Sequence, residues 1–516
     1  MKQIKLIIIS ILINPFFFYA QNAGDTFFNS SVVHDISITF LDPDWSDSLT
    51  QYKWYSDNLD SNVYLPASVT IDGTVLDSVG VRYKGNSSYY NYPTTKKPLK
   101  LDFNEFISGQ VFDGLKKMNL NNLYQDPTFM REKLFLDFIK SQGLYGPRAS
   151  YSRVFINGNY WGLYLSVDQI DKTFLQWNYG NKNGNLFKGD NSTSACADLD
   201  LHGNLQSYYN CYELKTNETT NDWSDLVTLT TQINATSNLV FRDSLEIVMN
   251  TNSFIGAWAC YNLLCNFDSY PYRFTHNYYT YHNTFTDKFE WIIWDVSTAF
   301  GLDIPWTIPQ VEQASIYYIW PIDTDRPLTY RMLQDSVYKQ AYTDFMCQYI
   351  NDFNPTVQFP IIDSLYNAIK TDVYADTLKM YTNQQFENNI LNTTSIGGFD
   401  VPGLKSFISN RFNNVLNELS TLNCTVTGVD NVIESHNNRV TIYPNPFTNY
   451  TLVEYTGVDT KWNWTLYNSL GQIVQQVKNI SNQKLIIHKG DLTNGIYMYH
   501  IQTTDKLDAS GKLIIK

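Results

Sequence analysis

The sequence has little positive charge. Its 37 lysines and arginines are outnumbered by 50 aspartates and glutamates, which gives a formal net charge of −13 at pH 7. An acidic surface repels phosphate backbones, so we expect no nucleic acid as a partner. Any site for a phosphate-bearing ligand must therefore gather its positive charge locally.

Long hydrophobic runs are absent after the first twenty residues. Residues 6–19 are almost wholly apolar; they follow Lys2 and Lys5 and end at Ala20, before polar residues. This pattern predicts a secretory signal peptide over residues 1–20, because the apolar run is too short to span a bilayer comfortably. An uncleaved membrane anchor is the alternative. No later stretch has the ~20 apolar residues of a spanning helix, so we expect no transmembrane segment in the mature chain.

Cysteine is scarce, with six in 516 residues. No His/Cys cluster has zinc-site spacing, so we expect no structural metal. An even number of cysteines in an exported chain permits disulfides. Cys196 and Cys211 flank a polar segment and are the best candidate pair, whereas no pattern supports a bridge between Cys347 and Cys424. The two cysteines of segment 260–265 lie on different faces of one predicted helix, which favours buried thiols.

The signatures of several enzyme classes are also missing. The chain has no HExxH motif, no dinucleotide-binding glycine fingerprint and no serine-nucleophile motif. It does have ample apolar material, with 43% hydrophobic and 16% aromatic residues, against 17% charged residues. That composition excludes a disordered chain, and the length suggests about two to four folded units.

Strand patterns dominate the N-terminal part. Apolar and polar residues alternate over residues 33–40, 79–83 and 99–103, which predicts strands with one buried face. The dipeptide Asn157-Gly158 stands between two further alternating segments and predicts a tight hairpin turn.

Helical patterns follow. A helix is predicted to begin at Asp126, because Asp caps helices and the next residue is Pro, which suits a first turn. Residues 190–220 are polar and loop-like. Residues 221–266 and 328–423 read as mostly helical, with a pair of short strands between them over about 278–294. A sheet-rich part therefore precedes a helix-rich part.

The C-terminal segment has a different pattern. Residues 425–438 are small and polar and predict a linker. Short alternating segments follow at 440–443, 451–455, 463–467, 472–477, 484–487, 495–502 and 510–515. Seven short strands in so few residues predict a small antiparallel sandwich.

Residues 439–516 also carry four motifs in a specific order. They are VTIYPNPF at 440–447, LYNSLGQ at 466–472, LTNGIY at 492–497 and GKLIIK at 511–516. Together they resemble the sorting domain of the type IX secretion system. The resemblance implies that the secretion machinery is a partner. It also implies export through the periplasm and outer membrane to the cell surface or beyond.

The larger part of the chain, residues 21–424, resembles the spore-coat protein H (CotH) kinase-like family. The resemblance rests on the order of many short segments rather than on any one of them. These segments are RYKGNSS at 82–88, KKPLKLDF at 96–103, LNN at 120–122, MRE at 130–132, NGNYWGLY at 157–164, GNLFKGD at 184–190, DS at 268–269, HNY at 276–278 and WDVSTAFG at 294–301. The family has an atypical protein-kinase fold and is implicated in ATP-dependent phosphorylation of protein serines.

The implied fold class is α+β. We expect an atypical protein-kinase-like core, with a sheet-rich N-terminal part and a helical C-terminal part, followed by a small all-β Ig-like sandwich. The implied cofactors are ATP and Mg²⁺ or Mn²⁺.

The first candidate for binding phosphate is the turn formed by Lys84, Gly85, Asn86 and Ser87. Gly85 permits close approach of the backbone, so the N–H groups of the turn could lie along phosphates. An ordinary hairpin turn is the alternative.

Phosphate also needs a cation and a partner for it. Lys97 and Lys100 lie on the next predicted strand, and the periodicity does not decide which of them faces the site. Glu132, early in the following helix, is the candidate partner, and Arg131 beside it could bind phosphate instead. Charges on a solvated helix face are the alternative for both.

The remaining candidates are carboxylates and an amide. By analogy with kinases, Asp268 would orient the acceptor hydroxyl, while Asn277 and Asp295 would hold the metal ion. Asp295 ends a hydrophobic strand, where a carboxylate is costly unless it is solvated, paired or metal-bound. Family members often carry Asp or Asn two residues later, whereas this chain has Ser297, a weaker metal ligand.

The sequence thus predicts a secreted kinase that transfers phosphate from ATP to Ser or Thr of a protein substrate. A non-catalytic surface or adhesion protein on a kinase-like scaffold is the alternative. A glycan-binding module is a third reading, which would need exposed, coplanar Trp or Tyr side chains.

Overall fold

The chain divides into two compact units, residues 1–428 and 429–516. The computed structural model describes residues 22–29, 32–59, 62–189, 196–272, 274–302, 306–319, 325–396, 399–422, 424, 440–443, 445–455, 461–468, 473–481, 484–490, 492–503 and 508–515. The predicted signal peptide and the predicted linker lie outside these residues.

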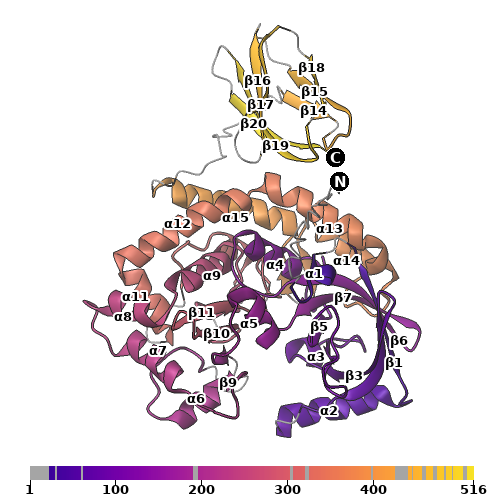
Figure 1. Ribbon diagram of the computed structural model, residues 1–516, viewed down its shortest axis with the longest axis vertical. Helices are drawn as coiled ribbons and strands as arrows, with labels where there is room; N and C mark the ends of the chain where they lie inside the picture. The colour runs from indigo at the N-terminus through magenta and orange to yellow at the C-terminus, as the bar shows by residue number, and fades with distance from the viewer. Residues whose placement is uncertain are drawn as a thin grey trace, which may run out of the picture. The chain divides into compact units, whose positions relative to one another are not determined.

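Seven strands of the first unit close into a barrel, drawn in indigo and purple in Figure 1, in the order β1-β2-β3-β4-β5-β7-β6. They are β1 (His34–Phe40), β2 (Leu65–Ile71), β3 (Thr74–Tyr83), β4 (Leu99–Asp102), β5 (Lys117–Asn121), β6 (Ala149–Ile156) and β7 (Asn159–Asp168). Neighbouring strands are antiparallel except β1 and β6, whose parallel pairing closes the barrel. Closure removes exposed strand edges.

The predicted alternation is confirmed. Val81, Tyr83, Leu99 and Leu101 point into the barrel and belong to one buried cluster. The predicted hairpin is β6–β7, and its turn residue Asn157 has φ 48°, as the tight turn requires.

A second sheet of four antiparallel strands lies in the same unit, in the order β11-β10-β8-β9. Its strands are β8 (Leu186–Gly189), β9 (Tyr212–Leu214), β10 (Tyr278–Asn283) and β11 (Lys288–Ile293). The predicted strand pair over 278–294 is therefore confirmed as β10 and β11. A short two-stranded ribbon, β12 (Thr394–Ile396) with β13 (Phe399–Val401), completes the strands described in this unit.

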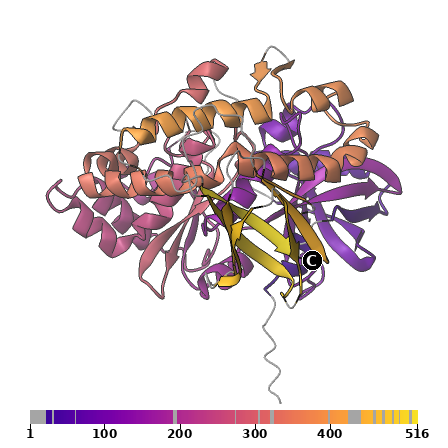
Figure 2. The same ribbon diagram turned by 90° about the horizontal axis from the view of Figure 1, so that it is seen from above.

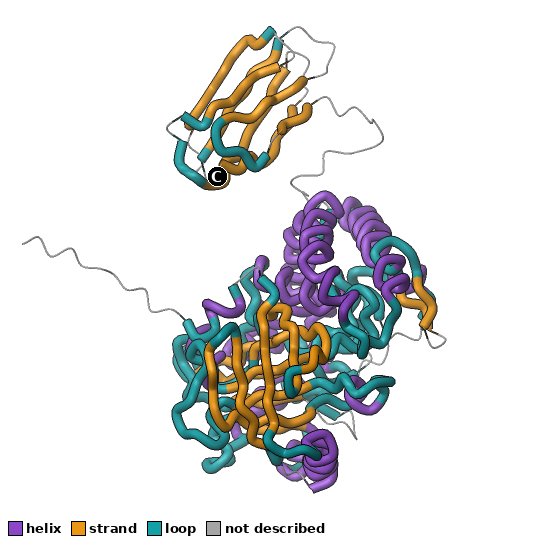
Figure 3. The backbone as a smooth tube through the Cα atoms, turned by 90° about the vertical axis from the view of Figure 1, so that its right-hand side faces the viewer, coloured by secondary structure: helices purple, strands orange, loops and turns teal. Residues whose placement is uncertain are grey.

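Helices account for much of the remaining sequence, and several of the longest lie together (Figure 3). They are α1 (Asp25–Phe28), α2 (Trp45–Leu59), α3 (Ser87–Tyr90), α4 (Arg131–Ser141), α5 (Lys172–Tyr179), α6 (Leu205–Cys211), α7 (Ser224–Asn234), α8 (Phe241–Val248), α9 (Thr251–Leu263), α10 (Ile308–Glu312), α11 (Pro327–Gln334), α12 (Ser336–Asp352), α13 (Pro355–Ala375), α14 (Asn383–Asn388) and α15 (Leu404–Ser420). Almost every residue of α9 is buried, since this helix packs against both β11 and α12. Helix α15 packs against α12 and α13 (Figure 2). No helix among the described residues is long and apolar enough to cross a membrane.

Two local predictions were wrong. The helix expected at Asp126 begins at Arg131, because Asp126 folds back in a turn and its carboxylate accepts the Arg131 N–H at 2.7 Å. The segment 190–220, expected to be a loop, contains α6 and β9. Helix α6 is capped by Asn204, and β9 pairs with β8, so a polar composition did not prevent regular structure here.

The predicted disulfide is present, together with a second one that no sequence pattern supported. Cys196 bonds to Cys211, and Cys347 bonds to Cys424, with Cα–Cα distances of 5.1 and 5.7 Å. The cysteines at 260 and 265 are buried free thiols, as expected.

The second unit contains seven strands in two antiparallel sheets, β14-β15-β18 and β17-β16-β19-β20. They are β14 (Val440–Tyr443), β15 (Tyr450–Tyr455), β16 (Trp462–Tyr467), β17 (Ile473–Ile480), β18 (Lys484–His488), β19 (Gly495–Thr503) and β20 (Asp508–Ile515). Trp462 and Trp464 of one sheet share a buried cluster with Val453 and Ile487 of the other. All seven predicted strands are confirmed.

A buried ion pair joins the barrel to the helical part of the first unit. Lys96, just before β4, lies 2.7 Å from the carboxylate of Asp376, just after α13, and both side chains are fully buried. The same carboxylate accepts the Leu163 N–H at 3.1 Å. Gly162 permits this approach, since a Cβ there would stand 2.5 Å from the Asp376 carboxylate.

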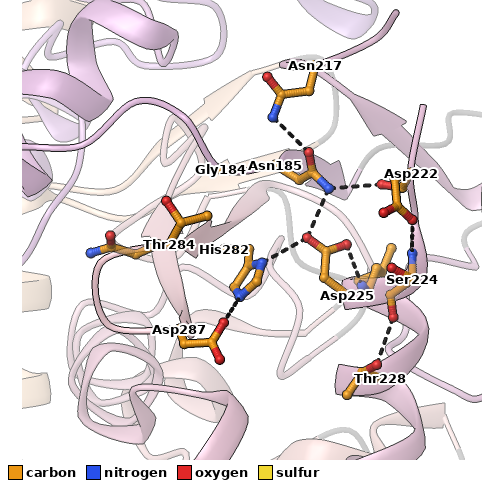
Figure 4. Close-up of polar contacts among 12 residues, drawn as sticks. Gly184, Asn185, Asn217, Asp222, Ser224, Asp225, Thr228, His282, Thr284 and Asp287 are labelled. Atoms are coloured by element: carbon orange, nitrogen blue, oxygen red, sulfur yellow. Dashed lines mark hydrogen bonds and ion pairs between the residues drawn. The ribbon is translucent and has the colours of Figure 1, made fainter. Parts of the chain in front are cut away.

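A network at one end of the second sheet joins β10 to α7 (Figure 4). His282 Nδ1 lies 3.0 Å from Asp225, and its Nε2 lies 3.1 Å from Asp287. Asn185 donates to Asp225 at 3.0 Å and accepts from Asn217 at 2.9 Å. The hydrogen bond to Asp225, aided by Asp287, raises the pKa of His282.

We expect Asp376→Ala to lower the free energy of unfolding by about 3–5 kcal/mol, because it leaves the Lys96 ammonium buried without a counter-charge. The double variant Lys96→Met with Asp376→Asn buries no charge and keeps an acceptor for the Leu163 N–H. It should therefore retain most of the stability that Asp376→Ala loses. The matched control is Asp137→Ala, which removes a surface pair with Lys133 and should cost about 0.5 kcal/mol. Urea unfolding measures each value, and a loss for Asp376→Ala no larger than the control contradicts the prediction.

The stability contributed by His282 should depend on pH. Because its pKa in the folded chain is raised above the ordinary 6.5, its contribution is fully present below pH 6.5 and disappears as the pH rises through the raised pKa. The difference in unfolding free energy between the native chain and His282→Gln should therefore be larger at about pH 5.5 than at about pH 9. The same difference at both pH values in urea unfolding would contradict this role.

Candidate functional site

The outer face of β3, β4 and β5 is polar because their apolar side chains fill the barrel. Arg82 on β3 pairs with Lys100 on β4, which pairs with Asn119 on β5. One row further along, Lys84 follows β3 and Asn121 ends β5. The closed barrel thus lines up cations and amides on one surface.

Lys84 is linked to Glu132 through an amide. The Lys84 ammonium donates to Asn121 Oδ1 at 2.9 Å, and Asn121 Nδ2 donates to Glu132 Oε1 at 2.8 Å. Glu132 is the second residue of α4 and is 5% exposed. A cation and an anion are therefore held in a fixed order, lysine–amide–carboxylate.

The pKa values of Lys84 and Glu132 are strongly shifted. Burial lowers the pKa of Lys84 to about 8, although Asp295 and Glu132 act in the opposite direction. Burial, together with the negative charge of Asp295, raises the pKa of Glu132 to about 8. Since Asp295 acts on both groups, the three side chains form one electrostatic cluster.

Lys100 lies among other cations. Burial lowers the pKa of its ammonium well below the ordinary value, and the charges of Arg82, Lys117 and Lys84 lower it further. The charge of Lys188 on β8 also lowers the pKa of Lys84, which places the second sheet beside these cations. Arg82, Lys84 and Lys100 form no salt bridge within 4 Å to the described residues, whereas Lys117 pairs with Asp102 at 3.0 Å.

The turn after β3 is exposed at Gly85, Asn86 and Ser87. Gly85 has φ 78°, and a Cβ there would stand 2.4 Å from the Ser88 hydroxyl, so glycine is required. The turn begins directly after Lys84.

Asp295 and Asn277 lie at the same end of the second sheet. Asp295 follows β11 with φ 47° and is exposed, and the Ser297 hydroxyl donates to its Oδ1 at 3.0 Å. Because Tyr278 pairs with Ile293, the antiparallel register brings Asn277 opposite the residues just before Asp295. Asn277 donates from Nδ2 to the Asp268 carbonyl at 2.8 Å, which leaves its amide oxygen for another partner.

Asp268 and His276 form a pair in the segment between α9 and β10. His276 Nε2 lies 2.7 Å from Asp268 Oδ1, and both side chains are partly exposed. The carboxylate is thereby held beside Asn277.

The structure groups most of the predicted residues. Lys84, Glu132 and Asp295 come together, with Lys100 beside them. Lys97 does not join them: it precedes β4, and its ammonium donates to the carbonyls of Tyr89 and Tyr92 at 2.8 Å each. Arg131 is also buried elsewhere, paired with Asp126 at 2.6 Å.

Sequence reasoning missed the roles of three residues, Arg82, Asn121 and Lys188. Arg82 and Lys84 occupy alternate positions at the end of one strand, so the period of two could have placed them on the same face. Asn121 carries no comparable signal, because its role depends on strand pairing.

No three side chains of His, Cys, Asp or Glu gather as a metal site in the described part of the chain. Mg²⁺ does not need such a cluster, since it usually takes one or two carboxylates with waters and phosphate oxygens. Asp295 and the amide oxygen of Asn277 are donors of the kind this ion prefers.

Comparison with known proteins identifies the family of the chain. Residues 81–415, which contain all of these side chains, match the model of the CotH kinase protein family. The chain belongs to the CotH family. Over 325 residues it is 25% identical to the inner spore coat protein H of Bacillus subtilis (strain 168), covering 63% of this chain and 85% of that protein.

The second unit of this CotH-family chain matches a different family model. Residues 441–516 match the model of the secretion system C-terminal sorting domain. The protein is therefore exported through the type IX secretion machinery, to the cell surface or out of the cell.

Binding of a phosphate-bearing anion should make the protein take up protons. The anion favours the charged form of Lys84 and the neutral form of Glu132, so both groups bind more protons near pH 8. We expect the heat of binding of pyrophosphate or ATP at pH 8 to vary with the ionisation enthalpy of the buffer. Lys84→Met should reduce that dependence, and equal heats in all buffers would contradict the assignment.

Proposed function

We propose that the chain is a secreted atypical protein kinase that transfers phosphate from ATP to Ser or Thr of a protein substrate. In this proposal the first unit is a kinase-like core whose small half is the barrel, and the second unit is an Ig-like sandwich that serves export.

The observation that carries the proposal is the cation group on the barrel. The chain has a net charge of −13, yet Arg82, Lys84 and Lys100 lie together on the outer face of β3 and β4. Clustered, partly desolvated cations favour a ligand with several negative charges, such as a triphosphate. The exposed Gly85–Ser87 turn would add backbone N–H groups beside it.

The residues around this group match the other needs of phosphoryl transfer. Kinases pair a phosphate-binding lysine with a glutamate on the following helix, which here correspond to Lys84 and Glu132 on α4. Lys100 would contact the phosphates from the neighbouring strand. Asp295 and Asn277 would hold Mg²⁺ or Mn²⁺, which when bound neutralises charge on the phosphate oxygens. Asp268, held by His276, would orient the acceptor hydroxyl.

One observation favours the alternative of a non-catalytic surface protein. The Ser297 hydroxyl donates to Asp295, so it occupies one carboxylate oxygen instead of supplying a further metal ligand. A weaker metal site would give a nucleotide-binding scaffold with little turnover. Nucleotide binding without transfer would therefore support this second function.

The test follows transfer of labelled phosphate from ATP, with Mg²⁺ or Mn²⁺, to the full chain itself and to a generic protein acceptor. We expect Asp295→Asn and Lys84→Met to reduce transfer by at least about 10²-fold, because each removes a charge that acts on the phosphates. Asp268→Asn should reduce transfer by about 10²–10⁴-fold while ATP binding persists.

Asp344→Asn on the exposed side of α12 is the control and should leave transfer unchanged. Transfer that persists in Asp295→Asn would contradict the site, and the absence of both transfer and ATP binding by calorimetry would refute the kinase proposal. ATP binding without transfer would select the surface-protein alternative.

A further inference from the structure

A hollow opens beside β11, an edge strand of the second sheet. It has a volume of about 220 Å³. It is lined by Gln142, Gly143, Leu144, Tyr145, Asn250, Asn252, Ser253, Ala257, Glu290, Trp291, Ile293 and Phe345. These residues come from the segment that follows α4, from the beginning of α9 and the residue before it, from β11 and from α12.

The hollow exists because β11 is an edge strand that is only partly covered. Asn250 N donates to the Phe289 carbonyl at 2.9 Å, and Trp291 N donates to the Ser253 hydroxyl at 2.9 Å. Further along the strand, Ile293 N donates to the Tyr145 carbonyl at 3.5 Å. Segments 142–145 and 250–253 thus bind the edge N–H and C=O groups of β11, and a gap remains between them. A gap that is walled by folded segments is a preformed site.

A carboxylate lies in this gap. Glu290 is 6% exposed, and only one of its oxygens has a partner among the described residues, Asn250 Nδ2 at 2.8 Å. Lys288 acts on its charge from two residues away but forms no salt bridge with it in the described structure. A buried carboxylate that lacks a counter-charge is costly unless a ligand supplies one.

The other walls favour a small organic cation. Tyr145 and Phe345 supply aromatic side chains, and rings attract ammonium groups. Leu144 and Ala257 add apolar surface that suits a short carbon chain. At the rim, Gln142 donates to Asp352 at 2.7 Å, which adds a second carboxylate near the entrance.

We propose that this hollow binds a small primary amine with a short apolar chain, its ammonium on Glu290 and its chain against Leu144, Ala257 and Phe345. The site is independent of the proposed transfer of phosphate and uses none of its residues.

The protonation of Glu290 gives binding a measurable signature. Burial raises the pKa of this carboxyl, so it keeps its proton to higher pH than a solvated glutamate does. An ammonium favours the carboxylate form, and binding therefore releases protons. This direction is opposite to the uptake expected at Lys84, which distinguishes the two sites.

The test titrates the full chain with butylammonium, butanol and butyrate, which share the chain length and differ in charge. We expect butylammonium to bind at millimolar concentration or below, with protons released, and butanol to bind at least about tenfold more weakly, because it lacks the charged donor. Butyrate should not bind. Equal affinity for the three compounds, or no binding of butylammonium, would overturn the proposal.

Variants locate the site. Glu290→Gln should weaken butylammonium binding at least about tenfold, whereas Glu246→Gln, an exposed carboxylate on α8, should leave it unchanged. If Glu290→Gln fails to fold by circular dichroism, Lys288→Met decides, since removing this competing charge should tighten butylammonium binding and leave butanol unaffected. Butylammonium binding unchanged in Lys288→Met and in any folded Glu290→Gln would exclude this hollow.

Discussion

Closure of the barrel is the constraint on which the rest of the first unit depends. A closed sheet has one inside, and the inside must be apolar, so the polar side chains of β3, β4 and β5 can only lie outside. Arg82 and Lys100 become cross-strand neighbours for this reason, and Lys84 and Asn121 fall one row beyond them. The site thus results directly from strand pairing and from the alternation of side chains along each strand. The register of the strands fixes the positions of the charged groups.

The same constraint explains why the charges are perturbed. Lys84 and Glu132 approach each other from a strand end and a helix start, with Asn121 between them, and the second sheet covers them from the side of Asp295. Removal of water raises the cost of each charge, and only the opposite charge nearby offsets it. The charges in such a site are not fully balanced, and a polyanion with a bound cation would balance them.

How much of this could be predicted from the sequence depended on the range of the interactions. The alternation at residues 99–103 and the Asn157-Gly158 turn are local, and the structure confirms both. The parallel pairing of β1 with β6 joins segments more than a hundred residues apart, and no local sequence pattern predicts it. Lys97 and Lys100 illustrate the limit within the site: three residues separate them, but only the position of the first residue of β4 decides that Lys100 faces the cations.

Two kinds of charge environment described above differ in whether an opposite charge is bound. Lys96 with Asp376, and Arg131 with Asp126, are matched one to one at 2.7 and 2.6 Å, and such pairs fix the position of one element against another. Lys100 is half-buried and Glu290 is buried, and neither forms a salt bridge with the described residues, so each charge is costly. An uncompensated charge next to an opening is explained when a ligand supplies the missing charge. By this criterion the cation group would bind an anionic ligand, and the hollow at β11 would bind a cationic one.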